Sequence, residues 1–205
     1  MGFNDFSASE VVNILDYGDL AKIFTAFGEE KKSKAISKKI VELRKNKKIN
    51  TQDLVKIIDN VKKNQFTKIH KSTKVFQALR IFVNKEISEL IYGLINSYKI
   101  LPLGGIIVVV TFHSLEDKIV KYFFKNYSEN KNSSRYLPNH LKNTILFKLS
   151  QKKPILPDIN EIKKNPPSRS AKLRYAIKIK EDLDFSDFKK KFEYFLNLEN
   201  LSKKL

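Results

Sequence analysis

The sequence predicts an α/β fold of the doubly wound type, preceded by a helical region, and three observations carry this prediction. Residues 7–62 show only the 3.6-residue spacing of short amphipathic helices. From residue 73 onward, a long helical pattern, a glycine-containing turn, a short apolar run and another helical pattern follow in that order. Two further strand patterns lie at 144–149 and 171–180. Such alternation of helices and buried strands is typical of a sheet covered by helices.

The helical region is predicted to hold four helices and no strand. Ser7 and Glu10 have capping-box spacing, in which each side chain accepts the other residue's backbone N–H. The second helix is expected to close at Gly28, because glycine is favoured directly after a helix. The fourth is expected to begin at Thr51. The third covers residues 30–46, and its outer side and exit carry nine cations: Lys31, Lys32, Lys34, Lys38, Lys39, Arg44, Lys45, Lys47 and Lys48.

The apolar run at 106–112 is the predicted centre of the sheet. Residues 73–100 form the longest helical pattern of the chain and end at the turn 101–105. A run that is β-branched and apolar throughout suits a central strand covered on both faces, as in parallel sheets. The next helix is predicted to start at Ser114, and a final amphipathic helix is predicted over 184–198.

Charge is the dominant compositional feature of the 205 residues. The net charge of +18 favours polyanions, above all RNA or DNA, since lysine and arginine neutralise phosphates. Lysine, asparagine and isoleucine are abundant together, so a coding bias toward A and T is the alternative explanation. The absence of cysteine excludes disulfides and thiolate chemistry. No apolar run reaches the roughly 18–20 residues that cross a bilayer, and we expect no membrane partner.

The segment Phe112–Asp117, FHSLED, is the sharpest local motif. In open α/β sheets, ligands bind beyond the carboxyl ends of the strands, which is where His113, Ser114, Glu116 and Asp117 would lie. The structural alternative is that Ser114 caps the following helix while the two acids complement its dipole. A serine hydrolase is not indicated, because no G-x-S-x-G elbow is present.

Two further segments carry weaker signals. Residues 165–168 read as a turn, because an Asn-Pro-Pro sequence without a closing aromatic residue follows no apolar strand. Arg169, Lys172 and Arg174 at a loop-to-strand junction suit either phosphate contact or an exposed strand face. The three scattered histidines do not have metal-site spacing, so no metal is expected.

Six collinear segments resemble one known family. They are SASEVVN (7–13), FGEEKKSKAISKKIVELR (27–44), KSTKVFQALRIFVNKEISEL (71–90), LPLGGIIVVVTFHSLEDKIVKYFF (101–124), KKPILPD (152–158) and NPPSRSAKLRYA (165–176). In order and spacing they resemble the RsmH (MraW) family of S-adenosylmethionine-dependent ribosomal RNA methyltransferases. The resemblance covers most of residues 1–180.

The resemblance implies a class I (Rossmann-like) methyltransferase sheet with an inserted helical substrate-recognition domain. Residues 1–72 would be most of this insert, 73–180 the carboxy-terminal half of the methyltransferase domain, and 181–205 a helical extension. The implied activity is methyl transfer from S-adenosylmethionine to N4 of a cytosine in small-subunit (16S) ribosomal RNA, in the cytoplasm. Catalytic candidates are His113, Ser114, Glu116 and Asp117, and RNA-binding candidates are Lys38, Lys39, Arg44, Arg80, Arg169, Lys172 and Arg174.

One departure from the family concerns the methyl donor. The family's glycine-rich donor loop and its acidic donor-binding residues precede the SASEVVN segment, and only six residues precede it here. We therefore assign no cofactor-binding residue and expect a truncated form, a misassigned start or a front half in trans. A homo-oligomer and a non-catalytic RNA-binding module are the alternatives. If the first four strands are absent, the strand at 105–112 should have an unpaired edge and an uncovered apolar face.

Overall fold

The computed structural model describes residues 6–63, 70–128, 145–181 and 184–205. The chain divides into two compact units. The first consists of the residues up to Glu89 together with Glu193–Leu205, and the second consists of Leu90–Phe192. We call them the helical unit and the sheet unit. The family-based division at residues 72 and 180 stays a prediction. Within the described ranges, no helix combines the length and the apolar character that a bilayer crossing requires.

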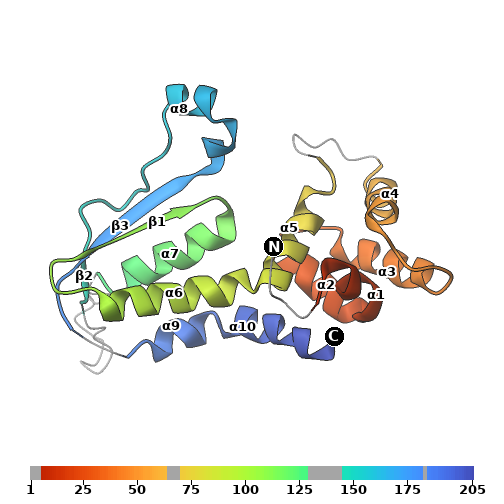
Figure 1. Cartoon of the computed structure of the whole chain (residues 1–205), viewed down its shortest axis with the longest axis horizontal. Coiled ribbons are helices and arrows are strands. Elements are labelled where there is room, and N and C mark those ends of the chain that lie inside the picture. The colour runs from red at the N-terminus through yellow and green to blue at the C-terminus, as the bar shows by residue number, and fades with distance from the viewer. Residues whose placement is uncertain (1–5, 64–69, 129–144, 182–183) are drawn as a thin grey trace, which may run out of the picture. The chain divides into compact units, whose positions relative to one another are not determined.

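The described residues of the helical unit form helices and no strand, as predicted (Figure 1). Its elements are α1 (Ala8–Ile14), α2 (Tyr17–Ala26), α3 (Ser33–Arg44), α4 (Thr51–Val61), α5 (Thr73–Asn84), α10 (Glu193–Glu199) and the 3₁₀ helix η3 (Asn200–Lys204). Helix α6 (Glu86–Ile100) begins here, and its residues from Leu90 onward belong to the sheet unit.

Two predicted helix starts are confirmed by their caps. The Ser7 hydroxyl accepts the Glu10 N–H at 3.4 Å, and the Glu10 carboxylate accepts the Ser7 N–H at 2.7 Å. Helix α4 begins at Thr51, with Asn50 and Asp53 forming a second capping box. Helix α3 begins at Ser33, later than the predicted start.

Gly28 follows α2 as predicted, but for a different reason. Its backbone is not left-handed, and the positive φ of 50° falls on the next residue, Glu29. A Cβ atom at Gly28 would lie 2.3 Å from the carbonyl oxygen of Lys74. Glycine is therefore required by the close approach of α5, not by the helix end.

The single helix predicted over 73–100 is wrong, because the backbone breaks at Lys85. This residue has a left-handed φ of 51°, ends α5 and donates its N–H to Phe82. The new helix α6 needs acceptors for its first N–H groups. The carboxylate of Glu199 supplies them, at 3.0 Å from the N–H of Ile87 and 2.9 Å from that of Ser88.

The sheet unit contains a three-stranded sheet in the order β1-β3-β2, with both pairings antiparallel. Its elements are β1 (Ile106–Thr111), α7 (Ser114–Asn126), β2 (Phe147–Lys148), α8 (Ile159–Lys164), the 3₁₀ helix η2 (Pro166–Ser170), β3 (Lys172–Lys178) and α9 (Ser186–Lys191). The pairing of β1 and β3 runs from Ile106 opposite Ile177 to Thr111 opposite Lys172. The two later strands were predicted, with wider bounds. The loop predicted at 128–143 lies, beyond Ser128, outside the described residues.

Strand β1 is not a central strand covered on both faces, which corrects the sequence-based expectation. Among the described strands it lies at the sheet edge. Ile106, Val108 and Val110 are 53%, 57% and 48% exposed, whereas Ile107 and Thr111 on the other face are buried. The predicted open edge and uncovered apolar face are thus confirmed for the residues that the structure describes.

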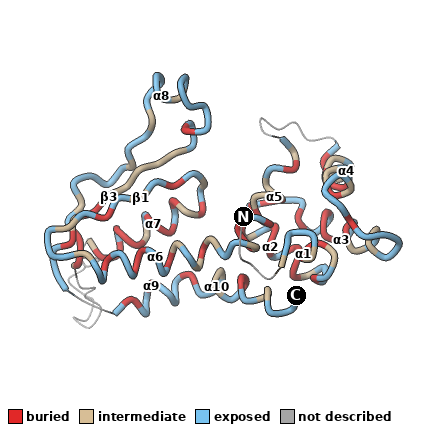
Figure 2. Tube along the Cα trace, in the orientation of Figure 1, coloured by how far each residue is buried: buried red, intermediate tan, exposed pale blue. Residues whose placement is uncertain are grey.

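The covered face of the sheet packs against an aromatic core. Phe123 on α7 contacts Phe147 on β2 and Phe185 before α9, with ring centroids 5.4 and 5.7 Å apart. Figure 2 shows buried residues alternating with exposed ones along α7, as an amphipathic helix requires. The predicted final helix is interrupted at Phe192, which is buried and ends α9.

Candidate functional site

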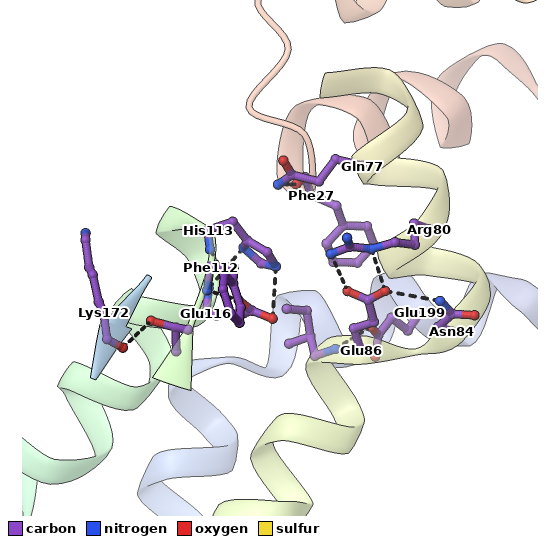
Figure 3. Close-up of polar contacts among 12 residues, drawn as sticks. Phe27, Gln77, Arg80, Asn84, Glu86, Phe112, His113, Glu116, Lys172 and Glu199 are labelled. Carbon is purple, nitrogen blue, oxygen red and sulfur yellow. Dashed lines mark hydrogen bonds and ion pairs between the residues drawn. The ribbon is translucent and has the colours of Figure 1, made fainter. Parts of the chain in front are cut away.

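The FHSLED segment forms the junction between β1 and α7. His113 has an extended backbone, and its Nδ1 accepts the Glu116 N–H at 3.3 Å. The Glu116 carboxylate accepts the N–H groups of Phe112 at 2.9 Å and His113 at 3.3 Å (Figure 3). A second carboxylate oxygen of Glu116 lies 3.3 Å from Nε2 of His113. The junction is therefore a capping box closed by an imidazole and a carboxylate.

The helix cap is His113 and not Ser114, which corrects one of the two sequence-based alternatives. Ser114 is the first helical residue and is exposed. His113 takes the cap position because it retains strand geometry, with φ of −134° and ψ of 164°. Histidine is not among the favoured capping residues, so capping by His113 was not predictable from residue type.

Asp117 points to the sheet and binds two cations of β3. Its carboxylate accepts from Nε of Arg174 at 2.7 Å and from the ammonium of Lys172 at 3.2 Å. The Arg174 side chain is only 10% exposed and also donates to the carbonyl of Lys152. The sequence assigned Asp117 to catalysis and Lys172 and Arg174 to RNA contact. In the structure these three residues form one ion-pair cluster.

Burial and hydrogen bonding together determine the charge of Glu116 and Asp117. Burial raises the pKa of Glu116, but hydrogen bonds from His113 and from the Phe112 N–H outweigh it and hold that pKa below its usual range. Burial likewise raises the pKa of Asp117, and hydrogen bonds from Arg174 and Lys172 lower it further than burial raises it. Both groups are therefore carboxylates at neutral pH, and neither is a proton donor.

The other predicted RNA-binding residues differ in how far they are engaged. Arg44 donates to the carbonyls of Val12 and Leu15 at the end of α1, at 3.0 and 2.6 Å. Arg80 forms a bidentate pair with Glu86 at 2.8 and 3.0 Å, drawn in Figure 3. Both arginines are therefore bonded within the helical unit, although 56% of the Arg80 side chain remains exposed.

Three exposed cations of the set are held by short-range contacts at most. Lys38 is exposed on α3. Lys39 pairs with Glu42 at 3.0 Å on the same helix. Arg169 in η2 contacts the Pro166 carbonyl at 3.3 Å. These three side chains are the members of the set that remain most available for phosphates.

Sequence reasoning missed the lysines of α7. Lys118, Lys121 and Lys125 are exposed and line two cavities beside this helix. Their spacing of three and four residues places them on one helix face, and this periodicity was readable from the sequence.

The described residues do not fit S-adenosylmethionine, the donor that the resemblance implies. Three N–H groups at the β1–α7 junction, those of Phe112, His113 and Glu116, are already bonded by side chains of the junction itself. The acidic Glu116 also disfavours the donor's carboxylate there. Gly104 and Gly105 lie at the opposite end of β1, away from the carboxyl edge where such ligands bind.

Comparison with known proteins identifies relatives over most of the chain. The MraW methylase family model matches residues 3–179. A ribosomal RNA small subunit methyltransferase H from Afipia carboxidovorans is 44% identical over 177 residues, covering 86% of this chain and 53% of the relative. The protein of the same name from Rhodopseudomonas palustris is 42% identical, covering 85% and 53%. That from Bartonella bacilliformis is 41% identical, covering 92% and 58%. The chain thus spans about half the length of these relatives.

Proposed function

Because this chain belongs to the MraW methylase family, we propose that it supplies the carboxy-terminal part of a cytoplasmic small-subunit ribosomal RNA methyltransferase. The reaction is methylation of the exocyclic N4 of a cytosine, with S-adenosylmethionine as donor. The donor is bound by the part of the enzyme that this chain does not match. The present chain supplies the RNA-binding helices and one wall of the site.

The open side of β1 carries this proposal. Its exposed face presents Ile106, Val108 and Val110, and Phe112 beyond the strand is 53% exposed. An apolar strand at a sheet edge with one uncovered face is a surface for pairing and burial. The relatives are about twice as long as the matched region, so a complementary half of suitable size exists in the family.

The acceptor base constrains what this chain must do. The cytosine amine is a weak nucleophile, because its lone pair is conjugated with the ring. Acceptors must hold the amine hydrogens, and the base must be unstacked to reach them, which favours single-stranded RNA. We assign base contact to the wall formed by His113, Ser114 and Glu116. Asp117 positions this wall through its ion pairs with β3.

A complementation experiment tests the proposal. The chain is co-expressed with the amino-terminal half of the Afipia carboxidovorans relative, and transfer of labelled methyl from S-adenosylmethionine to small-subunit ribosomal RNA is measured. We expect transfer by the pair and none by either part alone. A pair that associates and binds the donor but leaves every cytosine N4 unmethylated would overturn the assigned activity.

A matched pair of variants tests the role of the β1 face. Val108→Asp places a charge on the exposed face and should abolish association with the other half. Ile159→Asp, at a residue of α8 that is 72% exposed, adds the same charge in the same unit and should leave association intact. Equal effects of the two substitutions would refute docking on β1.

A non-catalytic RNA-binding module is the second candidate, favoured by the net charge of +18. Titration with S-adenosylmethionine separates the two. A reconstituted pair that binds RNA but not the donor would identify a binding module. Donor binding by the isolated chain would contradict the assignment of the donor site to the other half.

A further inference from the structure

Helix α7 carries a row of lysines on the side away from its apolar contacts. Lys118, Lys121 and Lys125 recur at intervals of three and four residues and are all exposed. Ile119, Val120 and Phe123 on the other side are fully buried. The helix thus has one face fixed by the core and one cationic face, which we call the α7 ridge.

A cavity lies on each side of the α7 ridge. The first has a volume of about 240 Å³ and reaches Lys152 and Lys153 after β2 and Arg174 of β3. The second has a volume of about 320 Å³ and reaches Tyr122, Lys191 and Phe192. Lys121 and Lys125 line both cavities, so they form the boundary between them.

The cavity walls are cationic beyond the average of this chain. Six of the fourteen residues that line the two cavities are lysine, and none of the fourteen is acidic. Asp117 neutralises the one arginine, Arg174. Lysine and arginine make up 40 of the 205 residues, about a fifth, but seven of these fourteen lining residues.

Apolar and aromatic surface lies beside these cations. In the second cavity the Lys191 ammonium lies 5.7 Å from the centre of the Tyr122 ring, and Phe192 lies next to it. Phe124 and Leu149 line the first. Alternating cations and aromatic pockets suit a flexible strand, because phosphates contact the cations while unstacked bases enter the pockets. A rigid duplex would contact the ridge alone.

We propose that the α7 ridge binds the backbone of single-stranded RNA, with bases accommodated in the two flanking cavities. This surface is separate from the helical unit and from the β1–α7 junction residues assigned above. The inference rests on the proposed ribosomal RNA substrate, and it adds a second RNA contact within the sheet unit.

Binding of a fluorescent 20-nucleotide single-stranded RNA to the full chain, followed by anisotropy across a salt series, tests the ridge. Each phosphate contact on a single strand contributes about 0.7 to the slope of log K against log salt. Lys121→Ala with Lys125→Ala should lower the slope by about 1.4. In 0.1 M salt this corresponds to about 25-fold weaker binding. Lys152→Ala with Lys153→Ala should give a similar loss.

The chain offers a matched control on α8. Lys163→Ala with Lys164→Ala removes the same charge from exposed helical positions of the same unit, outside both cavities. We expect binding to change less than threefold. Lys121→Arg with Lys125→Arg keeps the charge and should retain wild-type affinity. All six positions of the three double alanine variants are exposed, so their unfolding midpoints should be unchanged.

Three outcomes would overturn the inference. The ridge and α8 variants could lose equal RNA affinity, or the ridge variants could keep the wild-type salt slope. The ridge variants could also lose binding to anionic lipid vesicles while they keep binding to RNA. Because the assay measures RNA binding and not methyl transfer, these outcomes leave the proposed function standing. The two results can also differ. If the ridge variants lose RNA binding but the wild-type reconstituted pair never methylates RNA, the α7 ridge is supported and the proposed activity is refuted.

Discussion

Asp117→Asn is the substitution that most directly tests how the FHSLED segment is built. The change keeps the size of the side chain and one acceptor oxygen, but it removes the charge that faces Arg174 and Lys172. The Arg174 guanidinium is then left with 10% exposure and without a counter-charge. Breaking a buried ion pair costs about 3–5 kcal/mol. Because Lys172 keeps 40% of its side chain in solvent, we expect about 2–3 kcal/mol.

Glu116→Gln is the natural contrast, since it alters the neighbouring acid in the same way. Glutamine also closes a capping box, because its carbonyl oxygen accepts the N–H groups of Phe112 and His113. The expected cost is below about 1 kcal/mol. Two adjacent acids of one motif should therefore respond differently to the same chemical change.

Urea unfolding followed by circular dichroism measures the difference. With a slope of about 2 kcal/mol per molar urea, Asp117→Asn should lower the midpoint by about 1 M and Glu116→Gln by less than half of that. Hydrogen exchange of α7 and β3 peptides assigns the change to the sheet unit. In an Arg174→Met background the Asp117→Asn cost should nearly vanish. Similar costs for both acids, or a full Asp117→Asn cost without Arg174, would refute the ion-pair account.

The pH dependence of the same variant has a defined sign. The folded-state pKa of Asp117 is lowered, so its stabilisation is present above the unfolded pKa near 3.9 and is lost as the pH falls through the folded pKa. The gap between wild type and Asp117→Asn should therefore narrow in acid. A gap that widens below pH 4 would contradict this cause.

Three further predictions concern the scaffold. Gly28→Ala should destabilise the helical unit by about 1–3 kcal/mol, because the new Cβ meets the Lys74 carbonyl. Gly93 in α6 has open space around it, so Gly93→Ala should stabilise the protein by about 0.5–1 kcal/mol. Thermal unfolding measures both changes. Burial raises the pKa of Glu199 despite hydrogen bonds from Ser88 and Ile87, so the folded state binds a proton more tightly than the unfolded state. The free energy of unfolding should therefore fall as the pH rises from about 4.5 through the raised pKa. Glu199→Gln should flatten this profile in thermal melts between about pH 4 and 7. Lys178→Met should cost about 2 kcal/mol in urea unfolding, because the buried ammonium bonds the carbonyls of Tyr98 and Leu101, and Lys180→Met, at an exposed position, should change stability by less than about 0.5 kcal/mol.

Features encoded by adjacent residues were predictable from the sequence. The capping box at Ser7, the start of α4 at Thr51 and the start of α7 at Ser114 each depend on residues within one helical turn. The apolar run of β1 was equally clear, because six β-branched residues in succession favour a strand. The six family segments identified the chain for the same reason, since local patterns persist in order along the sequence.

Features that depend on distant partners were not predictable. The break at Lys85 divides a continuous helical pattern because Glu199, more than a hundred residues later, satisfies the new helix start. Asp117 reads as a candidate catalyst until Arg174, 57 residues on, is seen to hold it. The cap at His113 depends on the strand geometry of the chain before it.

The sequence by itself therefore determined the family, most of the helical and strand segments and the excess of positive charge. Only the tertiary structure decided which basic side chains bond within the protein and which remain exposed on its surface. Arg44 and Arg174 are partly buried and bond to the chain itself, whereas Lys118, Lys121 and Lys125 stay exposed beside two cavities. The physical reason is that contacts between residues far apart in the sequence, such as the Asp117–Arg174 pair or the capping of α6 by Glu199, depend on three-dimensional distance, which sequence spacing does not contain.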